Sequence, residues 1–395
     1  MLKESCDTIC KASIIMNVSS KRFFLVSNFH TYGIQHALYK YFIDHDASEV
    51  FFLNHPLHGI TKEYTSTLEI YSKKKNTKTN KFSRQNLPDF LSYSIDFFMT
   101  VKQGIQISGK IDVFVGFNSM NTIPGLVLKL LGKVKYVITY SHSFKNVRYQ
   151  NKLMNVLYKT VDSLAIRYSD SVWGLGEPLI KIRKKQGVAK EKIVLAQDGV
   201  NTKLFRPLPY HTKRRFLLVF VGLINEINGL ELVIDALPDL VKENFDYTLD
   251  VIGEGEDLEK IKQKVALLRL QKHVRFHGIF SIEKLAAFLP MCGIGIATYK
   301  PVKDSTLKTT DPMKTKLYMA AGLPLVSTDI YMTAHEIRDH ALGELIRYDV
   351  KEFIRAIKKI TNEKRYKQYR KNNIHFVQKY DWNNIFTTAC NNTNL

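Results

Sequence analysis

Short apolar segments alternate with amphipathic ones along most of the chain. In the first half, runs rich in Val, Ile and Phe predict short buried strands. These strands are expected at residues 23–27, 50–54, 112–116, 135–139 and 192–196. Helical periodicity predicts helices between some of them, at residues 33–45 and 153–169. Short buried strands that alternate with helices are typical of parallel sheets covered on both faces, so the first half predicts an α/β domain.

The same alternation starts again beyond residue 215. Residues 205–215, FRPLPYHTKRR, carry two prolines and a basic run, and they interrupt the pattern. Further strands are expected at 216–222, 247–253 and 293–299, with helices at 229–243 and 256–270. The sequence thus predicts two tandem Rossmann-like domains, with a cleft at the carboxyl ends of their strands. The predicted divisions are an N-terminal extension 1–20, domains 21–207 and 208–376, and a C-terminal helix, 377–395, that could cross back to the first domain.

Positive charge is the outstanding bulk property. The formal net charge is +21, and basic residues cluster at 73–84, 181–192 and 358–371. Such a balance suits phosphorylated substrates, acidic lipid headgroups or nucleic acid. Because the chain has no zinc-finger spacing and no aromatic–basic RNA-binding signature, no nucleic-acid partner is expected. Residues 61–110 show no clear periodicity, and the basic stretch at 72–86 predicts a mobile loop.

Cellular location follows from absences in the sequence. No apolar run reaches the roughly 18–20 residues that a membrane-spanning helix needs. The first residues are too mixed for a secretion signal, and the four cysteines show no metal-type spacing. We therefore predict a cytoplasmic protein, whose basic surface would allow peripheral attachment to the inner face of an anionic membrane.

Residues 309–329, TTDPMKTKLYMAAGLPLVSTD, suggest an anion site. A loop ends at Asp311, Pro312 suits the first position of a helix, and Lys314 lies in its first turn. A helix start offers free N–H groups and the positive end of a dipole, and a lysine there adds a charge for a phosphate. Taken alone, the stretch also fits an ordinary strand–loop–helix with a solvated Lys314.

The order and spacing of several segments resemble the GT-B glycosyltransferases, particularly the retaining group called family 4 in its polysaccharide-biosynthesis branch. The likeness covers nearly the whole chain. It is carried by VFVGLINEINGLELVIDAL (219–237), VIGEGEDLEKI (251–261) and DPMKTKLYMAAGLPLVST (311–328), and in the first half by residues 112–140 and 167–188.

The resemblance implies transfer of a sugar, with retention, from a nucleotide-sugar donor to a glycan or lipid-linked acceptor. The donor would lie on the C-terminal domain and the acceptor on the N-terminal domain. The nucleotide sugar is a co-substrate, and neither a metal ion nor another cofactor is expected. A product in surface polysaccharide or glycolipid synthesis would fit the branch.

The resemblance also implies donor-binding residues. Lys314, with the N–H groups around Pro312 and Met313, would hold the diphosphate and offset charge on the leaving group. The turns at Gly222 and Gly253 would allow close approach to the nucleotide. The remaining donor-side candidates are Asn228, Gly229, Glu254 and Leu317.

Three positions depart from the family pattern. The family often has an arginine where this chain has Leu223, a lysine where it has Asn228, and a ribose-binding glutamate where it has Leu317. Of the family's cations, only Lys314 remains in register. These differences mark either a subgroup or an enzyme that has lost activity.

Candidates on the acceptor side come from the first domain. His142 follows a strand and is a candidate catalytic residue together with Lys314, while Tyr32 and Gly33 lie where the first strand turns into its helix. Arg148 could meet an anionic acceptor, as could Arg183, although basic residues of this kind are more often simply solvated. His55 and His58 are better explained as loop residues than as metal ligands.

Other functions compete with the transferase. A catalytically inactive GT-B scaffold would bind no nucleotide. A basic nucleic-acid-binding protein would show salt-sensitive affinity for DNA or RNA. A sugar-nucleotide epimerase of similar shape would convert the donor without an acceptor.

Overall fold

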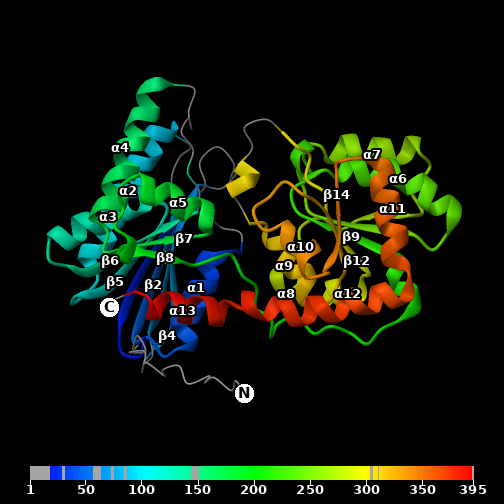
Figure 1. Cartoon of the computed structure of the whole chain (residues 1–395). Helices are drawn as coiled ribbons and strands as arrows, with labels where there is room; N and C mark the ends of the chain where they lie inside the picture. Colours follow the sequence, from blue (N-terminus) through cyan, green and yellow to red (C-terminus); the bar gives the residue numbers. More distant parts are fainter. Residues whose placement is uncertain are drawn as a thin grey trace, which may run out of the picture.

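Two open sheets, each flanked by helices, lie side by side (Figure 1). A computed structural model describes residues 18–28, 32–56, 64–72, 75–83, 87–142, 144, 151–302, 306–309 and 311–393. The predicted α/β class and two-sheet architecture are confirmed.

Every strand and helix predicted in the first half is present in the structure, and the strands belong to one sheet. Its strands are β1 Arg22–Ser27, β2 Glu49–Asn54, β3 Thr65–Ser72, β4 Lys75–Ser83, β5 Ile111–Phe117, β6 Val134–Ser141, β7 Ser171–Gly174 and β8 Ile193–Leu195. Its helices are α1 Ile34–Asp44, α2 Asp89–Gln106, α3 Ser119–Leu130, α4 Lys152–Tyr168 and α5 Glu177–Lys185. The strand order is β4-β3-β2-β1-β5-β6-β7-β8.

The second sheet is parallel throughout. Its strands are β9 Leu217–Val221, β10 Thr248–Ile252, β11 Val274–Phe276, β12 Ile294–Ala297, β13 Leu325–Thr328 and β14 Gly343–Ile346, in the order β11-β10-β9-β12-β13-β14. The helices of this part are α6 Leu230–Glu243, α7 Leu258–Leu267, α8 Ile282–Phe288, α9 Met313–Ala320, α10 His335–Asp339, α11 Val350–Thr361 and α12 Glu363–Phe376, followed by α13 Trp382–Asn391.

The prediction of a loop at 72–86 is wrong, because β4 occupies residues 75–83. Strand β4 pairs antiparallel with β3, and β3 pairs antiparallel with β2, so the first sheet is not parallel throughout. Strand β4 lies at the edge of the sheet, where lysines keep their charged ends in water and discourage pairing with another chain. The polar composition of β4 therefore does not indicate a strand, because pairing with β3 stabilises it.

Alternate residues of the central strands pack into two different cores. Phe23 and Leu25 of β1 join the core under α1, whereas Phe24 and Val26 join the core under α3. This follows from the two-residue period of a strand. Both faces of the sheet are therefore apolar, and both are covered.

The last helix returns to the first sheet. Trp382 and Phe386 of α13 belong to the core that contains β1 and α1, and their rings stack at 5.0 Å between centroids. Just before α13, Val200 and Asp381 form an isolated parallel bridge. Figure 1 shows α12 and α13 running in succession beneath both sheets. The domain boundaries proposed from the sequence stay predictions.

This packing predicts a strong effect of shortening Phe386. Because its ring is fully buried, Phe386→Ala should lower the free energy of unfolding by about 3–5 kcal/mol. Phe245→Ala is the matched control, since Phe245 is 71% exposed and should change stability by less than about 0.5 kcal/mol. Chemical denaturation of both variants measures the difference, and equal effects would contradict the packing of α13.

Candidate functional site

Lys314 lies in the first turn of α9, at the carboxyl edge of the second sheet. Its Nζ donates a hydrogen bond to Asn228 Oδ1 at 2.9 Å. The same ammonium lies 4.6 Å from the ring centroid of Phe220 and 4.7 Å from that of Tyr299. In the part of the chain that the structure describes, no carboxylate forms an ion pair with it. Lys314 is therefore a cation held by aromatic faces and an amide.

Burial lowers the pKa of the Lys314 ammonium to about 7. Loss of hydration disfavours the charged form, and no anion compensates for it. An anion arriving beside Nζ would restore the charge. The Lys314 ammonium can therefore attract a phosphate, and a bound phosphate would raise its pKa.

Two helices begin beside this ammonium. Gly229 precedes α6 and Pro312 precedes α9, and among the described residues no side chain caps either helix. A Cβ placed on Gly222 would lie 3.0 Å from Lys314 Nζ, so the end of β9 is in contact with the lysine. The positive ends of two helix dipoles thus converge on Lys314, and this arrangement favours an anion.

Gly229 and Gly253 hold backbone positions that a side chain would block. Gly229 has φ +67°, and its Cβ would lie 1.6 Å from the carbonyl oxygen of Thr298. Gly253 has φ +140°, and its Cβ would lie 1.9 Å from the carbonyl oxygen of Gly222. These contacts bring the ends of β9, β10 and β12 together beneath the start of α6.

The structure brings most donor-side candidates together. Lys314 is hydrogen-bonded to Asn228, a Cβ on Gly222 would reach both of these side chains, and Gly229 and Gly253 lie next to this group. Pro312 and Met313 form the start of α9 and are partly buried.

Two donor-side candidates contribute differently. Glu254 is exposed just beyond β10, and its carbonyl oxygen accepts a hydrogen bond from the Ile224 N–H at 2.9 Å. Leu317 is a core residue that is fully covered, so its side chain contributes packing beneath α9 and no polar contact.

A buried ion pair supports α9, and the sequence analysis missed it. Lys316, two residues beyond Lys314, pairs with Asp311 where both side chains are almost fully enclosed. Thr333 Oγ1 donates a hydrogen bond to Asp311 Oδ1 at 2.6 Å. Burial raises the pKa of the nearby Asp198 carboxyl to about 7, with Lys316 opposing and Asp311 adding to the shift. Nothing in the sequence spacing distinguishes Lys316 from a solvated lysine.

His142 lies directly beyond β6, at the carboxyl edge of the first sheet. Its ring stacks on Phe117 at 5.6 Å and contacts Tyr140 at 5.2 Å between centroids. Burial lowers the pKa of His142 to about 4, so its imidazole is neutral near pH 7. A neutral imidazole can donate or accept a hydrogen bond without adding charge.

Tyr32 connects the two halves electrostatically. Burial raises the pKa of its phenol, and the Glu283 carboxylate of α8 raises it further, so Tyr32 lies near the second part of the chain. Gly33 has φ −166°, which is extended backbone that any residue adopts. The role of Gly33 on the acceptor side stays a prediction. Arg148 and His58 lie outside the described residues.

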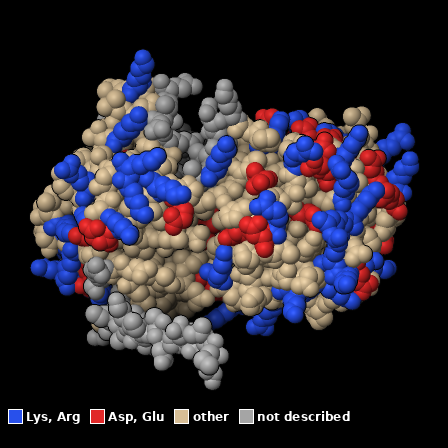
Figure 2. Space-filling model, viewed as in Figure 1, with Lys and Arg blue, Asp and Glu red and all other residues tan. Residues whose placement is uncertain are grey.

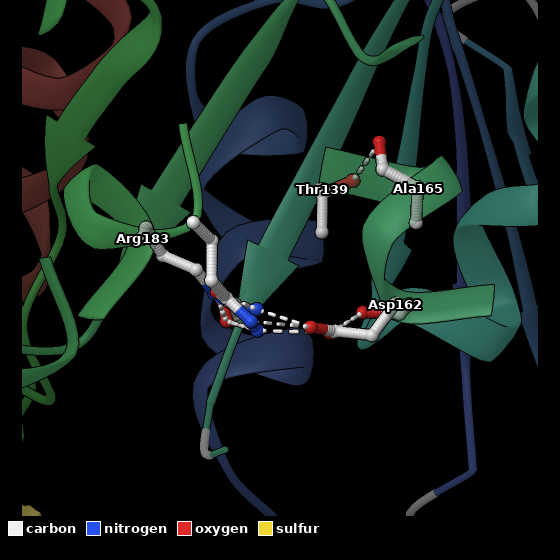
Figure 3. A network of polar contacts seen from close by, with 7 residues as sticks. Thr139, Asp162, Ala165 and Arg183 are labelled. Atoms are coloured by element: carbon white, nitrogen blue, oxygen red, sulfur yellow. Dashed lines mark hydrogen bonds and ion pairs between the residues drawn. The ribbon is translucent and has the colours of Figure 1, made fainter. Parts of the chain in front are cut away.

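Arg183 is neither solvated nor directed at an acceptor, contrary to the expectation for basic residues in this region. Its Nη2 donates to Ser141 Oγ at 2.6 Å and to Asp162 Oδ1 at 3.0 Å. Figure 3 shows Arg183 of α5 and Asp162 of α4 pointing toward each other. Ser119 Oγ also donates to Asp162. This network fixes α4 and α5 to the end of β6, immediately before His142.

His55 is likewise enclosed by the fold. Its Nδ1 lies 2.9 Å from Ser66 Oγ, and its Nε2 lies 2.9 Å from Thr100 Oγ1. Both ring nitrogens are thus engaged with hydroxyl groups of neighbouring elements, as in a structural core histidine.

The family comparison agrees with this geometry. Residues 215–363 match the family model described as glycosyl transferases group 1. The second part of this chain is a group 1 glycosyltransferase domain. By sequence alone, no curated protein matches the chain.

Solved glycosyltransferase structures extend the likeness to the first sheet. HepE of Anabaena, in complex with UDP and glucose, is 12% identical with a TM-score of 0.64, and the match covers 92% of this chain and 97% of that one. Sucrose-phosphate synthase of Thermosynechococcus elongatus is 14% identical with a TM-score of 0.67, covering 92% and 96%. WaaG, a glycosyltransferase involved in lipopolysaccharide biosynthesis, is 13% identical with a TM-score of 0.64, covering 94% and 99%.

The structural matches confirm the predicted GT-B fold, and the family model confirms the predicted glycosyltransferase class over residues 215–363. The chain thus combines two α/β units in the GT-B arrangement. The individual site residues stay predictions.

The geometry at Gly229 makes a testable prediction about stability. Gly229→Ala should lower the free energy of unfolding by more than about 2 kcal/mol, because the methyl group would overlap the Thr298 carbonyl in addition to the left-handed backbone strain. Gly132→Ala isolates the strain, since Gly132 has φ +70° and nothing within 4 Å, and should cost about 1 kcal/mol. Thermal and chemical denaturation compare the two, and equal losses would contradict the close approach at Gly229.

Proposed function

We propose that this glycosyltransferase takes a sugar from a nucleotide-sugar donor, whose diphosphate binds at Lys314, and transfers it with retention. The acceptor is a glycan or a lipid-linked sugar bound by the first domain. The product belongs to surface polysaccharide or glycolipid synthesis. HepE and WaaG, which share the fold, support a nucleotide sugar and a glycan pathway as the first possibilities to test.

The observation that carries the proposal is the Lys314 ammonium at the meeting point of two helix starts. Its hydrogen bond to Asn228 and its contacts with Phe220 and Tyr299 leave it without an anionic partner among the described residues. A diphosphate supplies the missing charge, and the starts of α6 and α9 supply backbone N–H groups. Because these groups are already in place, little reorganisation opposes binding.

The same groups suit the chemical step. The bond between the sugar and the diphosphate breaks as the acceptor oxygen forms the new glycosidic bond on the same face. A phosphate oxygen of the departing diphosphate takes the acceptor's proton. Protonated Lys314 stabilises the negative charge that develops on this leaving group. Positioning and electrostatics, rather than a protein nucleophile, are the enzyme's contribution.

His142 and Tyr32 are the acceptor-side residues in this proposal. His142 is neutral near pH 7 and lies at the carboxyl edge of the first sheet. Tyr32 lies close enough to the second domain to sense Glu283. Both could hydrogen-bond an acceptor hydroxyl without adding charge.

The departures from the family fit an active subgroup. Asn228, where the family often has a lysine, orients Lys314 through its Oδ1 and is itself held by Asn225 at 2.7 Å. This region therefore has one oriented cation, Lys314, where the family often has additional basic residues. Leu317 fills the core where a ribose-binding glutamate is common, so ribose contacts must come from other residues.

Nucleotide binding tests the proposal. Calorimetry with UDP, GDP, ADP and their sugars should find one base that binds saturably. Lys314→Met should weaken that binding by roughly tenfold to a hundredfold, because it removes a charge-assisted contact. Lys308→Met is the matched control, since Lys308 is exposed in the segment before α9 and should leave binding unchanged.

The outcomes separate the transferase from its rivals. Binding that needs Lys314, followed by transfer to an acceptor with an α-linked product by NMR from an α-linked donor, supports the whole proposal. A folded protein that binds none of these nucleotides would indicate the inactive scaffold. Donor conversion without an acceptor would indicate an epimerase.

Proton uptake gives an independent prediction. Burial holds the pKa of Lys314 at about 7, and the diphosphate should raise it, so binding of a nucleotide sugar above pH 7 should take up protons. The affinity should consequently fall as the pH rises through about 7 and beyond. The diphosphate diester of the donor does not itself titrate near neutrality. Calorimetry in buffers of different ionisation enthalpy measures the uptake, which should vanish in Lys314→Met; uptake that persists there would refute the role of Lys314.

A further inference from the structure

Helix α4 carries a second apolar face that the fold does not cover. Its inward face buries Tyr158, Ala165 and Ile166. A separate stripe faces outward with helical spacing and consists of Leu153, Val156, Leu157, Leu164 and Tyr168. Leu153 is 75% exposed and Val156 is 62% exposed, so these side chains stand largely in solvent. A helix that needs one buried face for the core has no structural reason to carry this stripe.

The exposed charged side chains of α4 around the stripe are all basic. Lys152, Lys159 and Arg167 of α4 are exposed. The single carboxylate of the helix, Asp162, is buried and paired with Arg183. In Figure 2 the projection at upper left, where Figure 1 places α4, shows tan and blue atoms without red. The exposed side of α4 is thus apolar and cationic.

An apolar groove continues the stripe toward α2. A cavity of about 300 Å³ lies between α2 and α4, and residues of α3 also line it. Its walls include Phe97 and Phe98 of α2, Ile123 of α3, and Met154, Leu157 and Val161 of α4. Phe98 and Leu157 are exposed at this groove, so it opens onto the same surface as the stripe.

We propose that α4 and the α2–α4 groove form the surface through which this protein docks on an anionic lipid bilayer. Apolar side chains would enter the boundary between headgroups and acyl chains, and the lysines and arginine would meet the lipid phosphates. In the described part of the chain, no helix is both long and apolar enough to span a bilayer. A second copy fits this surface less well, because it would bring two cationic faces together.

The docking surface is connected rigidly to the acceptor side. Asp162 of α4 accepts from Arg183, and Arg183 donates to Ser141, the residue before His142. This inference deepens the proposed function, since a bilayer at α4 would present a lipid-linked acceptor to the first domain. The observations on α4 nevertheless stand without the donor site.

Vesicle binding tests the surface directly. The full chain should sediment with vesicles of equal parts phosphatidylcholine and phosphatidylglycerol, and much less with phosphatidylcholine alone. The pair Leu153→Glu with Leu157→Glu should reduce partitioning about tenfold or more. The pair Lys152→Glu with Lys159→Glu should reduce it about tenfold and flatten its dependence on salt.

Matched variants keep the test specific. Leu267→Glu with Phe245→Glu adds the same charge at exposed apolar positions of the second domain and should not change partitioning. Lys364→Glu with Lys371→Glu reverses two exposed lysines of α12 and should have only a small effect. The thermal unfolding midpoint should be nearly unchanged in all four variants, which shows that each remains folded whether or not the protein binds a nucleotide.

The outcomes distinguish this inference from the proposed function. Absence of vesicle binding, equal binding to neutral vesicles, or equal loss in the control pairs would overturn the docking surface. Self-association that disappears in the Leu153 and Leu157 variant, without vesicle binding, would instead assign the face to a second copy and also overturn it. Vesicle binding in a protein that binds no nucleotide would leave the surface standing while the transferase proposal fails.

Discussion

The ammonium of Lys314 is the constraint around which the second domain is organised. It lies against two aromatic rings and an amide oxygen, and the described structure places no carboxylate in an ion pair with it. A cation in such surroundings loses hydration without gaining a counter-charge, which explains its lowered pKa. The starts of α6 and α9 add positive dipole ends at the same point. Within the described structure, the Lys314 ammonium therefore has no counter-charge.

The position of Lys314 depends on contacts beneath it. Lys316 of α9 pairs with Asp311 just before this short helix, and Thr333 donates a hydrogen bond to the same Asp311 oxygen, Oδ1. Removing one member of a buried pair leaves an uncompensated charge, so the pair acts as a unit. The first domain also has a buried ion pair, between Arg183 and Asp162. Together with Ser141, it connects α4 and α5 to the strand end before His142. Each sheet thus has a buried ion pair behind the edge that carries the candidate residues Lys314 or His142.

Helix α13 makes the two domains depend on each other. The chain leaves the second domain after α12, and Trp382 and Phe386 then complete a core of the first. Backbone hydrogen bonds of Val200 with Tyr380 and Trp382 join the two segments of the chain that pass between the domains. The first core therefore includes residues from the far end of the sequence.

The sequence by itself determined the alternation of strands and helices, since two-residue and 3.6-residue periods of apolar side chains report directly which face is buried. It also placed Lys314 at a helix start, because Pro312 and the adjacent turn mark that boundary locally. Strand β4 escaped prediction because its lysines and polar residues are stabilised by pairing with β3 rather than by their own propensity. Only the tertiary structure decided that Lys314 meets Asn228, that Arg183 is buried and that α4 has an uncovered apolar face. Those properties depend on contacts between residues far apart in the chain, and local periodicity carries no information about such contacts.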